Sequence, residues 1–174
     1  MKTLNEFFDL LKNQFGEAVI ELKQDIDPYI IVSADIMDKL VEFIKVNDDF
    51  KFDFCTCVSG VDDANGTKSK DENGNDVITG GTLSVFYHFR RLFDDAKLIF
   101  RVQVPRENPK VKSIANIYRA ADWHEREAYD MFGIIFENHP YLRRILMPYD
   151  WEGHPLRKDY QNPEFYQGIK ISYN

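Results

Sequence analysis

The chain has 174 residues, enough for one domain with a single hydrophobic core and an appendage. Hydrophobic residues make up 44% of it and aromatic residues 14%, a globular composition that excludes an intrinsically disordered chain. The formal net charge is -7, and no stretch is basic enough to predict a nucleic-acid-binding surface.

The N-terminal sequence predicts neither secretion nor membrane insertion. It lacks the apolar core of a signal peptide, and no apolar run in the chain approaches the ~20 residues that cross a bilayer. We therefore expect any membrane association to be indirect, through other chains. Cys55 and Cys57 lie one residue apart on a predicted strand, where a disulfide would be strained. We interpret them as reduced, packed cysteines of a cytosolic protein, too few to hold an iron–sulfur cluster.

The first third of the chain predicts two helices and three strands. Thr3 and Glu6 have the spacing of a capping box at the start of a helix that Gly16 ends. Ser33 is the predicted N-cap of the second helix. Apolar residues at helical and alternating spacing set the boundaries of the other elements. The predicted strands cover residues 17–22, 29–32 and 52–59, and the second helix covers residues 35–46.

Residues 60–81 consist almost entirely of turn formers and charged residues, which predicts a long mobile hairpin loop. Its Asp, Asn and Gly residues suggest calcium, but the EF-hand spacing and the flanking helices are absent, so we favour a solvated loop. Strands are predicted again over residues 83–89 and 97–104. His88 lies on the first of them, and we expect it to be a hydrogen-bonded core histidine.

The C-terminal part predicts two helices, a short strand and a tail. Ser113 is expected to start a short helix that runs to Tyr118, and Asp122 to cap a longer one that Gly133 ends. A last strand follows over residues 134–136. Residues 137–174 contain four of the seven prolines and show no periodicity, yet they are rich in aromatic residues that require burial.

These elements predict an α+β fold, because strands and helices mix without strict alternation. We expect a globular domain over residues 1–136, with a mixed, largely antiparallel sheet, helices packed on one face and the 60–81 loop as an insertion. Residues 137–174 are expected to form an extended irregular C-terminal tail that packs on a partner subunit.

Familiar catalytic motifs are missing from the sequence. The run His124-Glu125-Arg126-Glu127-Ala128 has no second His where a zincin helix requires it. There is no Walker loop, no G-x-G-x-x-G motif and no nucleophile elbow, which argues against nucleotide binding, flavin binding and acyl transfer by this chain.

Glu125, Glu127 and Asp130 are potential general acids or bases, and Arg126 can pair with Asp130 on one helix face. Aromatic residues interleave these charges, so we expect the charges to lie close to buried surface and to need partners. Those partners are either the basic pairs of the tail or groups on another subunit. The basic pairs, Arg143-Arg144 and Arg157-Lys158, are also potential ligands for phosphate or carboxylate.

The same region carries a resemblance to a known family. The run Glu125-Arg126-Glu127-x-x-Asp130-Met131-Phe132, followed by His139 and Arg143-x-Ile145-Leu146, resembles the signature of the C subunit of proton-pumping NADH:quinone oxidoreductase (complex I), the 30 kDa subunit. Residues 153–160 are similar to the second block of that family, and softer resemblance covers residues 80–166. Residues 147–148 and 162–166 also resemble the J subunit of the photosynthetic relatives, whose electron donor is ferredoxin, which leaves the donor open.

The resemblance implies a non-catalytic scaffold in the peripheral arm of an enzyme that passes electrons from NADH through iron–sulfur clusters to quinone and pumps protons. It implies that this chain binds no cofactor, that flavin and clusters lie in other subunits, and that the D subunit is the chief partner, with the B and I subunits nearby. The implied location is the cytoplasmic side of the bacterial inner membrane. A ferredoxin-driven relative, a stand-alone acid–base enzyme and a regulatory binding module are the alternatives. The signature residues that are candidates for partner contact are Glu125, Arg126, Glu127, Asp130, His139, Arg143, Arg144, His154, Arg157, Lys158 and Asp159.

Overall fold

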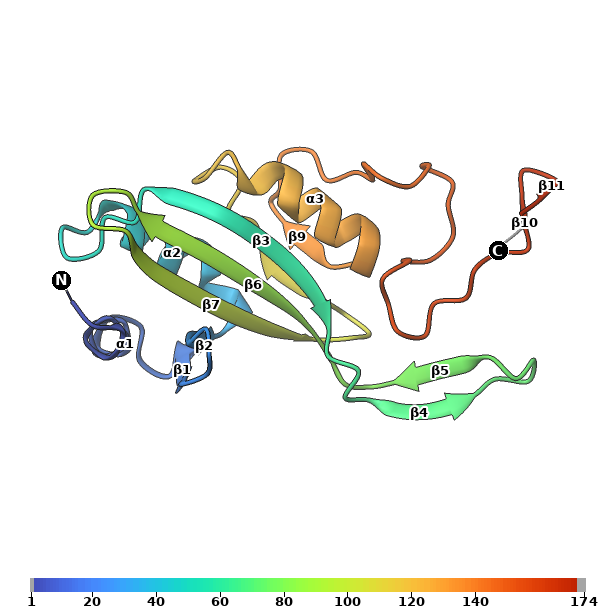
Figure 1. Ribbon diagram of the computed structural model, residues 1–174, viewed down its shortest axis with the longest axis horizontal. Helices are drawn as coiled ribbons and strands as arrows, with labels where there is room; N and C mark the ends of the chain where they lie inside the picture. The colour runs from blue at the N-terminus through green and yellow to red at the C-terminus, as the bar shows by residue number, and fades with distance from the viewer. Residues whose placement is uncertain (1, 172–174) are drawn as a thin grey trace.

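The computed structural model describes residues 2–171. Its centre is a five-stranded sheet in the order β1-β2-β7-β6-β3, in which only β2 and β7 pair in parallel (Figure 1). This arrangement confirms the predicted α+β class with a mixed, largely antiparallel sheet. The strands are β1 (Val19–Lys23), β2 (Tyr29–Val32), β3 (Phe54–Asp62), β6 (Thr82–Arg91) and β7 (Ala96–Pro105).

The sheet has one buried face and one open face. On β6, the residues Leu83, Val85, Tyr87 and Phe89 are buried in the core, while the residues between them point to the other side. Figure 1 looks onto the open face, with α2 behind the sheet. The helices that pack with the buried face into one core are α1 (Leu4–Phe15), α2 (Met37–Val46) and α3 (Ala121–Phe132).

The first two helices begin differently. The capping box of α1 is confirmed, since Glu6 donates its backbone N–H to Thr3 Oγ1 and Thr3 donates its own to Glu6 Oε2. The prediction for Ser33 is wrong, because its side chain makes no cap hydrogen bond and a 3-10 turn over Ala34–Ile36 precedes α2.

The 60–81 segment is more ordered than a plain loop. β3 extends to Asp62, and β4 (Thr67–Lys70) pairs with β5 (Asp76–Thr79) in an antiparallel hairpin that projects from the sheet (Figure 1). Asp71 closes its turn by accepting the N–H groups of Asn73 and Asn75. The sequence therefore predicts the turn residues of this segment correctly, but it does not predict that residues 67–70 and 76–79 pair as strands.

Several predictions between residues 105 and 137 are wrong. Residues 113–118 form turns instead of a helix, because Ser113 Oγ donates to Glu125 and does not cap a helix. Asp122 does not cap α3, which begins at Ala121. β8 (Lys110–Lys112), which was not predicted, pairs in parallel with β9 (Ile135–Glu137).

α3 covers the free edge of β3 and thereby fixes the position of the signature residues. His124 Nδ1 accepts the backbone N–H of Val58 at 3.1 Å, so the helix satisfies an edge strand. A Cβ on Gly60 would lie 2.6 Å from Cδ2 of Phe132, which shows how closely α3 approaches the strand. Gly133 ends the helix in the left-handed region at φ 73°, as predicted.

Candidate functional site

Asp130, in the last turn of α3, binds the start of the tail. Its fully buried carboxylate accepts the backbone N–H groups of Ile145, Leu146 and Met147 at 2.9, 2.7 and 2.9 Å. Arg144 donates Nη1 to the other carboxylate oxygen at 2.8 Å. Burial opposes ionisation, but these donors outweigh it and lower the pKa of Asp130. The carboxylate is therefore the anion around which residues 144–147 are organised.

The tail also satisfies the C-terminal carbonyl groups of α3. Helices leave their last four carbonyls without intrahelical partners. Here the carbonyl of Tyr129 accepts from Gly133 N, that of Asp130 lies 3.0 Å from His154 Nδ1, and that of Met131 accepts from Leu156 N. Arg157 Nε donates to the carbonyl of Phe132 at 2.7 Å. The tail thus completes the helix end, where a cation is also favoured by the helix dipole.

Arg106 ties the tail to the base of the β4–β5 hairpin. The buried guanidinium donates to Asp62 at 2.7 Å and also pairs with Asp159. Burial opposes its charge, but the two carboxylates outweigh this effect and raise the pKa of Arg106. Asp62 accepts Lys158 N at 2.8 Å, and Asp159 accepts Ile78 N of β5 at 3.2 Å. These contacts bring β3, β5 and the tail to one point.

Glu125 is a fully buried carboxyl on the inner side of α3. It accepts Ser113 Oγ at 2.6 Å and Ile114 N at 2.8 Å, and His139 Nε2 lies 3.9 Å away. Burial, with a smaller contribution from the Asp122 charge, raises the pKa of Glu125 to about 7. The group joins α3 to the 113–118 turns and has no exposed surface.

Arginine and aromatic side chains stack on the outer side of α3. The Arg126 guanidinium lies 4.7 Å from the Trp123 ring centroid and 5.9 Å from that of Tyr141, and Arg143 lies 4.3 Å from Tyr141. Trp123 is 62% exposed and Tyr141 is 58% exposed. Trp, Tyr and Arg are the residue types that contribute most at protein interfaces, so this stack is suited to contact with another protein.

The large apolar side chains of the tail divide into two groups. Leu142 packs against the core, and Trp151 donates Nε1 to Tyr160 while its ring lies 5.2 Å from that of Tyr166. Other large apolar side chains point outward, and two of them, Leu146 and Leu156, do so although their backbone N–H groups are bound to α3. Those exposed tail residues are Tyr141, Leu146, Tyr149, Leu156, Phe165 and Ile169.

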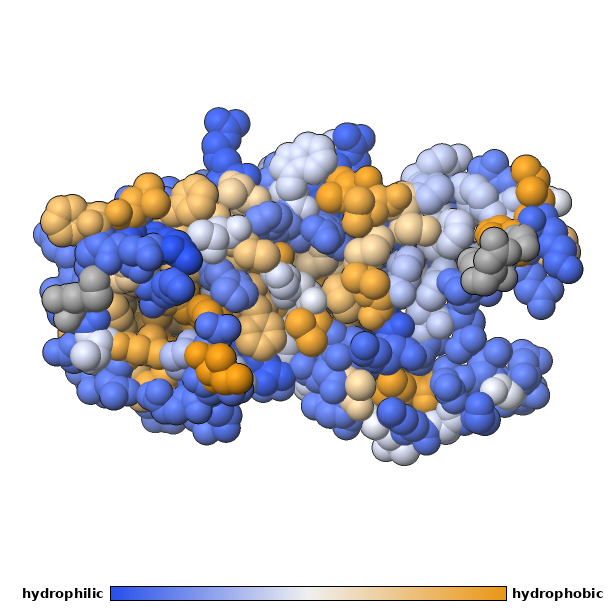
Figure 2. Space-filling model, viewed as in Figure 1, coloured by the Kyte–Doolittle hydropathy of each residue, from blue (hydrophilic) through white to orange (hydrophobic). Residues whose placement is uncertain are grey.

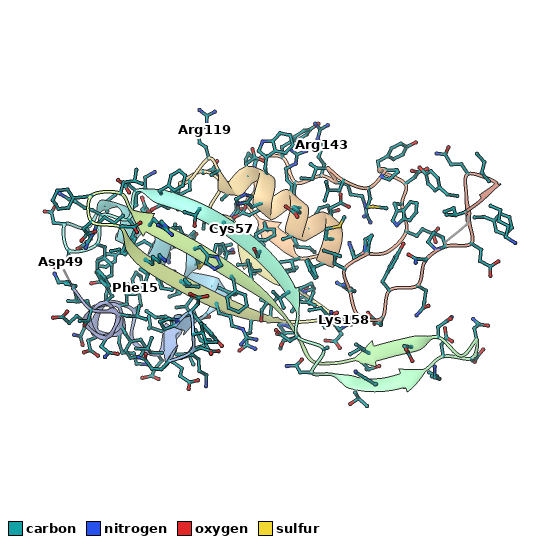
Figure 3. The ribbon with its side chains drawn as sticks, viewed as in Figure 1. Phe15, Asp49, Cys57, Arg119, Arg143 and Lys158 are labelled. Carbon is teal, nitrogen blue, oxygen red and sulfur yellow. The ribbon has the colours of Figure 1, made fainter. Side chains whose placement is uncertain are left out.

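The predicted site residues therefore fall into different environments. Asp130 meets Arg144, so one of the expected partners in the tail is present, whereas Arg126 approaches Asp122 at 3.9 Å and is not paired with Asp130. Glu127 is exposed, and the Lys158 side chain is exposed while its backbone N–H is bound. Figure 3 shows Arg143 and Lys158 on opposite sides of α3. Glu125 and Asp130 are fully buried and have separate hydrogen-bond partners, whereas Glu127 faces solvent.

Sequence reasoning missed Arg106 and Asp62. The two residues are 44 positions apart, and each contact of Arg106 joins segments that no local pattern connects. An unpaired Asp at a strand end and an Arg after a strand are common, so neither carries a signal by itself.

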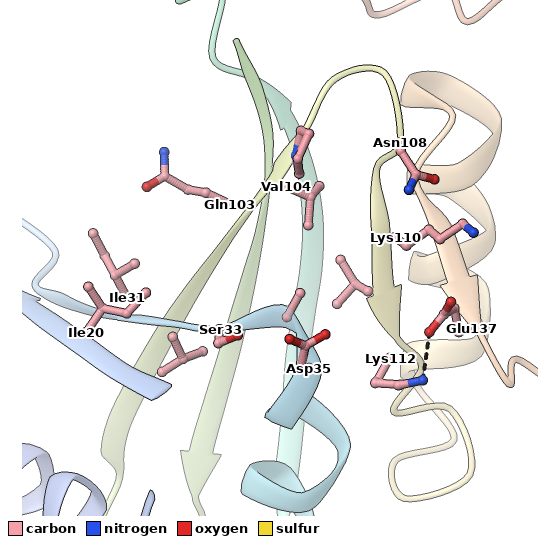
Figure 4. A pocket seen from close by; sticks show the side chains of 14 residues that line it. Ile20, Ile31, Ser33, Asp35, Gln103, Val104, Asn108, Lys110, Lys112 and Glu137 are labelled. Atoms are coloured by element: carbon pink, nitrogen blue, oxygen red, sulfur yellow. Dashed lines mark hydrogen bonds and ion pairs between the residues drawn. The ribbon is translucent and has the colours of Figure 1, made fainter. Parts of the chain in front are cut away.

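A cavity of about 480 Å³ between β2, the end of β7 and β8 is a second possible site (Figure 4). Its lining carries both charges, with Asp35 and Lys110 beside an ion pair of Lys112 and Glu137 at 2.7 Å. The lining also contains the hydroxyl of Ser33, and it includes neither Cys nor His.

Residues 2–171 contain neither a metal-binding cluster nor a helix that could cross a membrane. Within that range, no three His, Cys, Asp or Glu side chains gather in a geometry suited to a metal ion. Burial raises the pKa of Cys55 to about 12, which is typical of an inert packed thiol. None of the helices in the same range combines the length and the hydrophobicity that a bilayer crossing requires.

Comparisons with known proteins give a consistent result. Residues 30–166 match the family model "Respiratory-chain NADH dehydrogenase, 30 Kd subunit". The chain is 40% identical over 169 residues to the NADH-quinone oxidoreductase C subunit of Chloroherpeton thalassium, covering 95% of this chain and 64% of that protein. It is 34% identical over 168 residues to the NADH-quinone oxidoreductase C subunit of Chlorobium phaeobacteroides, covering 95% of this chain and 93% of that protein. It is 50% identical over 96 residues to the chloroplastic NAD(P)H-quinone oxidoreductase J subunit of Marchantia polymorpha, covering 53% and 57%.

Solved structures show the same fold. The trypsin-resistant fragment (1-134) of Nqo5 matches with a TM-score of 0.59 at 22% identity and covers 78% of this chain and 98% of that one. A chain of the membrane-bound sulfane sulfur reductase, an archaeal respiratory membrane complex, matches with a TM-score of 0.63 at 19% identity, covering 90% and 85%.

Proposed function

The chain belongs to the 30 kDa subunit family of respiratory-chain NADH dehydrogenase, which is the C subunit of NADH-quinone oxidoreductase, and we propose that it is a scaffold of the peripheral arm of complex I without redox chemistry of its own. Electrons pass from NADH through the flavin and iron–sulfur clusters of other subunits to quinone. This chain holds those subunits in place, on the cytoplasmic side of the bacterial inner membrane, and reaches the membrane only through its partners.

One observation carries the proposal: residues 144–159 of the tail are bound to the domain while large apolar side chains among them face outward. Asp130 and Arg106 fix residues 144–159, so the chain does not lose that ordering entropy on assembly. Tyr149 is 92% exposed at the centre of this segment. A surface that is ordered and apolar before its partner arrives is suited to stable assembly.

The D subunit is the proposed chief partner of residues 137–174, with the B and I subunits nearby. Burial of the outward apolar side chains contributes roughly 25 cal/mol per Å². The exposed cations of the tail, chiefly Arg143 and Lys158, determine the position and the specificity of its contact with the D subunit more than the affinity of that contact. On this view residues 1–136 are the rigid domain, and residues 137–174 are a binding segment whose first half that domain holds in place.

Limited trypsin digestion tests the proposal. The isolated chain should be cut first after the exposed Lys170, which lies beyond the part of the tail that Asp130 and Arg106 fix, whereas this site should resist cleavage once the chain is bound to the D subunit. The fragment solved for Nqo5 is itself trypsin-resistant and covers residues 1-134 of that protein, which supports a boundary of this kind. Equal cleavage rates in the isolated chain and in the complex would contradict the proposal.

A matched pair of variants sharpens the test. Tyr149→Ser removes an exposed ring from the tail, and we expect it to weaken protection and co-purification with the D subunit without changing the melting temperature. Phe93→Ser removes a comparably exposed ring, 96% accessible, from the turn between β6 and β7 at a distance from the tail. It should leave assembly unchanged, and an equal effect of both variants would argue against a specific tail interface.

A place in the ferredoxin-driven photosynthetic relative is the second candidate, because the identity to the chloroplastic J subunit reaches 50% over 96 residues. The two candidates differ in the donor. Oxidation of NADH by the purified assembly supports the first, and oxidation of reduced ferredoxin without NADH oxidation supports the second.

A further inference from the structure

The open face of the sheet carries a hollow that the proposed tail interface does not use. The turn between β1 and β2 overhangs β2, β7, β6 and β3, and the hollow beneath it measures about 580 Å³. This volume falls in the range that holds a large side chain or a small molecule. Figure 2, which looks onto this face, shows hydrophobic side chains over the strands with hydrophilic ones among and around them. The main residues that line the hollow are Asp25, Asp27, Tyr29, Phe86, His88 and Ile99.

The floor of the hollow is aromatic and is suited to a cation with an apolar stem. Tyr29 and Phe86 meet edge to face with their centroids 5.4 Å apart. The Arg101 guanidinium already lies 5.8 and 5.4 Å from these two rings, which shows that they accept such a group. Arg101 pairs with Asp63 at 2.9 Å, so its charge is compensated and does not repel a second cation.

The rim of the hollow is acidic and uncompensated. Asp25 accepts only the neighbouring backbone N–H of Ile26, and neither Asp25 nor Asp27 pairs with a Lys or Arg of the described residues. Burial lowers the pKa of His88, so this imidazole is neutral at pH 7 and adds no opposing charge. His88 is half-buried on the open face and does not lie in the core, so that part of its prediction was wrong, and a hydrogen bond with the Cys57 backbone partly opposes the effect of burial on its pKa. Two cations line the adjoining space next to Asp27 and His88: Arg90 is paired with Asp95, and Lys97 forms no ion pair among residues 2–171.

We infer that this hollow binds a Lys- or Arg-bearing apolar segment of a neighbouring subunit. The stem of the basic side chain lies on Tyr29, Phe86 and Ile99, and its charge reaches Asp25 and Asp27. A polypeptide fits better than a small organic cation because Ile26, which is 96% exposed, extends the apolar surface beyond the hollow at the tip of the overhanging turn. This interface lies on the open face, so it is separate from the contact through the tail.

Photocrosslinking in the assembled enzyme tests the inference. p-Benzoylphenylalanine replaces Phe86 with a ring of related shape, and mass spectrometry identifies the crosslinked peptide after irradiation. We expect one segment of another subunit that carries a Lys or Arg. The double variant Asp25→Asn, Asp27→Asn should reduce the yield by about tenfold, since each partly exposed ion pair contributes up to roughly fivefold.

The matched control is Asp9→Asn with Glu42→Gln, which changes the net charge equally at exposed helix positions and should leave the yield unchanged. The inference is overturned by the absence of a crosslink, by a yield that does not respond to loss of the two carboxylates, or by an adduct of low molecular mass, which would indicate a small cation. The same probe at Tyr149 reports the tail interface separately, so failure at Phe86 alone leaves the proposed function intact.

Discussion

Asp130 of α3 and Arg144 of the tail form an ion pair at 2.8 Å in which the carboxylate is fully buried and the guanidinium is nearly so. A buried carboxylate is tolerated only where hydrogen bonds replace the water it has lost. Three backbone N–H groups complete that shell, so one side chain fixes both the path of the tail and the outward direction of Leu146.

Asp130→Asn should loosen the tail. The amide removes the charge and places an NH₂ group opposite N–H donors, so we expect a loss of roughly 2–4 kcal/mol in the free energy of unfolding and faster trypsin cleavage after Lys158. Urea unfolding and digestion of the isolated chain measure the two effects. Glu127→Gln on the same helix is the control, because this exposed side chain should change stability by no more than about 0.5 kcal/mol.

Gly133→Ala should destabilise the same junction through sterics. Gly133 has φ 73°, and a Cβ there would collide with the imidazole of His154 and the guanidinium of Arg157. Gly74→Ala is the matched control, since Gly74 has φ 82° with open space around it and loses only the conformational preference, about 1 kcal/mol. We expect Gly133→Ala to exceed this loss by about 1–3 kcal/mol. Equal losses of stability for both variants in thermal unfolding would show that His154 and Arg157 move aside at no energetic cost.

The sequence predicts elements whose signals are local. The apolar alternation of residues 97–104, the capping box at Thr3 and the stop at Gly133 all depend on neighbours within one or two turns. Residues 113–118 have a helix-start signal, but Ser113 Oγ is bound by Glu125 from another element. A tertiary contact of this kind overrides the local preference for a helix, and the sequence of residues 113–118 gives no sign of it.

The residue types of the candidate site could be predicted from the sequence, but the contacts between its residues could not. Charges interleaved with aromatic residues on α3 indicated partners close by, and Arg144 is one of them. The contact of Arg106 with Asp159 joins residues 53 positions apart and depends on the end of β7 lying beside the middle of the tail. A single sequence carries no distance information of this range.

Arg106→Met should be among the most destabilising substitutions in the chain. It leaves the fully buried Asp62 carboxylate without its cation, and uncompensated burial of a charge costs about 3–5 kcal/mol. Arg90→Met is the control, because Arg90 and Asp95 form a solvent-exposed pair worth about 1 kcal/mol or less. Chemical denaturation of both variants measures the difference. A similar small loss for both would mean that water replaces the Arg106 guanidinium without penalty.

Glu125 should make stability fall as the pH rises. Its pKa is about 7 in the folded chain against an ordinary value of 4.5, so between these values the native state retains a proton that the unfolded state releases. The stabilisation that this proton provides is complete below about pH 4.5 and is lost by about pH 7, a change of roughly 3 kcal/mol.

Glu125→Gln isolates this effect from other titrating groups. Gln is neutral at every pH, and the Ser113 hydroxyl can rotate to accept from its amide, so the shape of the junction is retained. Urea unfolding at pH 5 and pH 8 should show the difference between variant and parent moving by about 2.5 kcal/mol in favour of the variant at the higher pH. A difference that stays constant with pH would show that Glu125 is ionised throughout, held by Ser113 and the Ile114 N–H despite its burial.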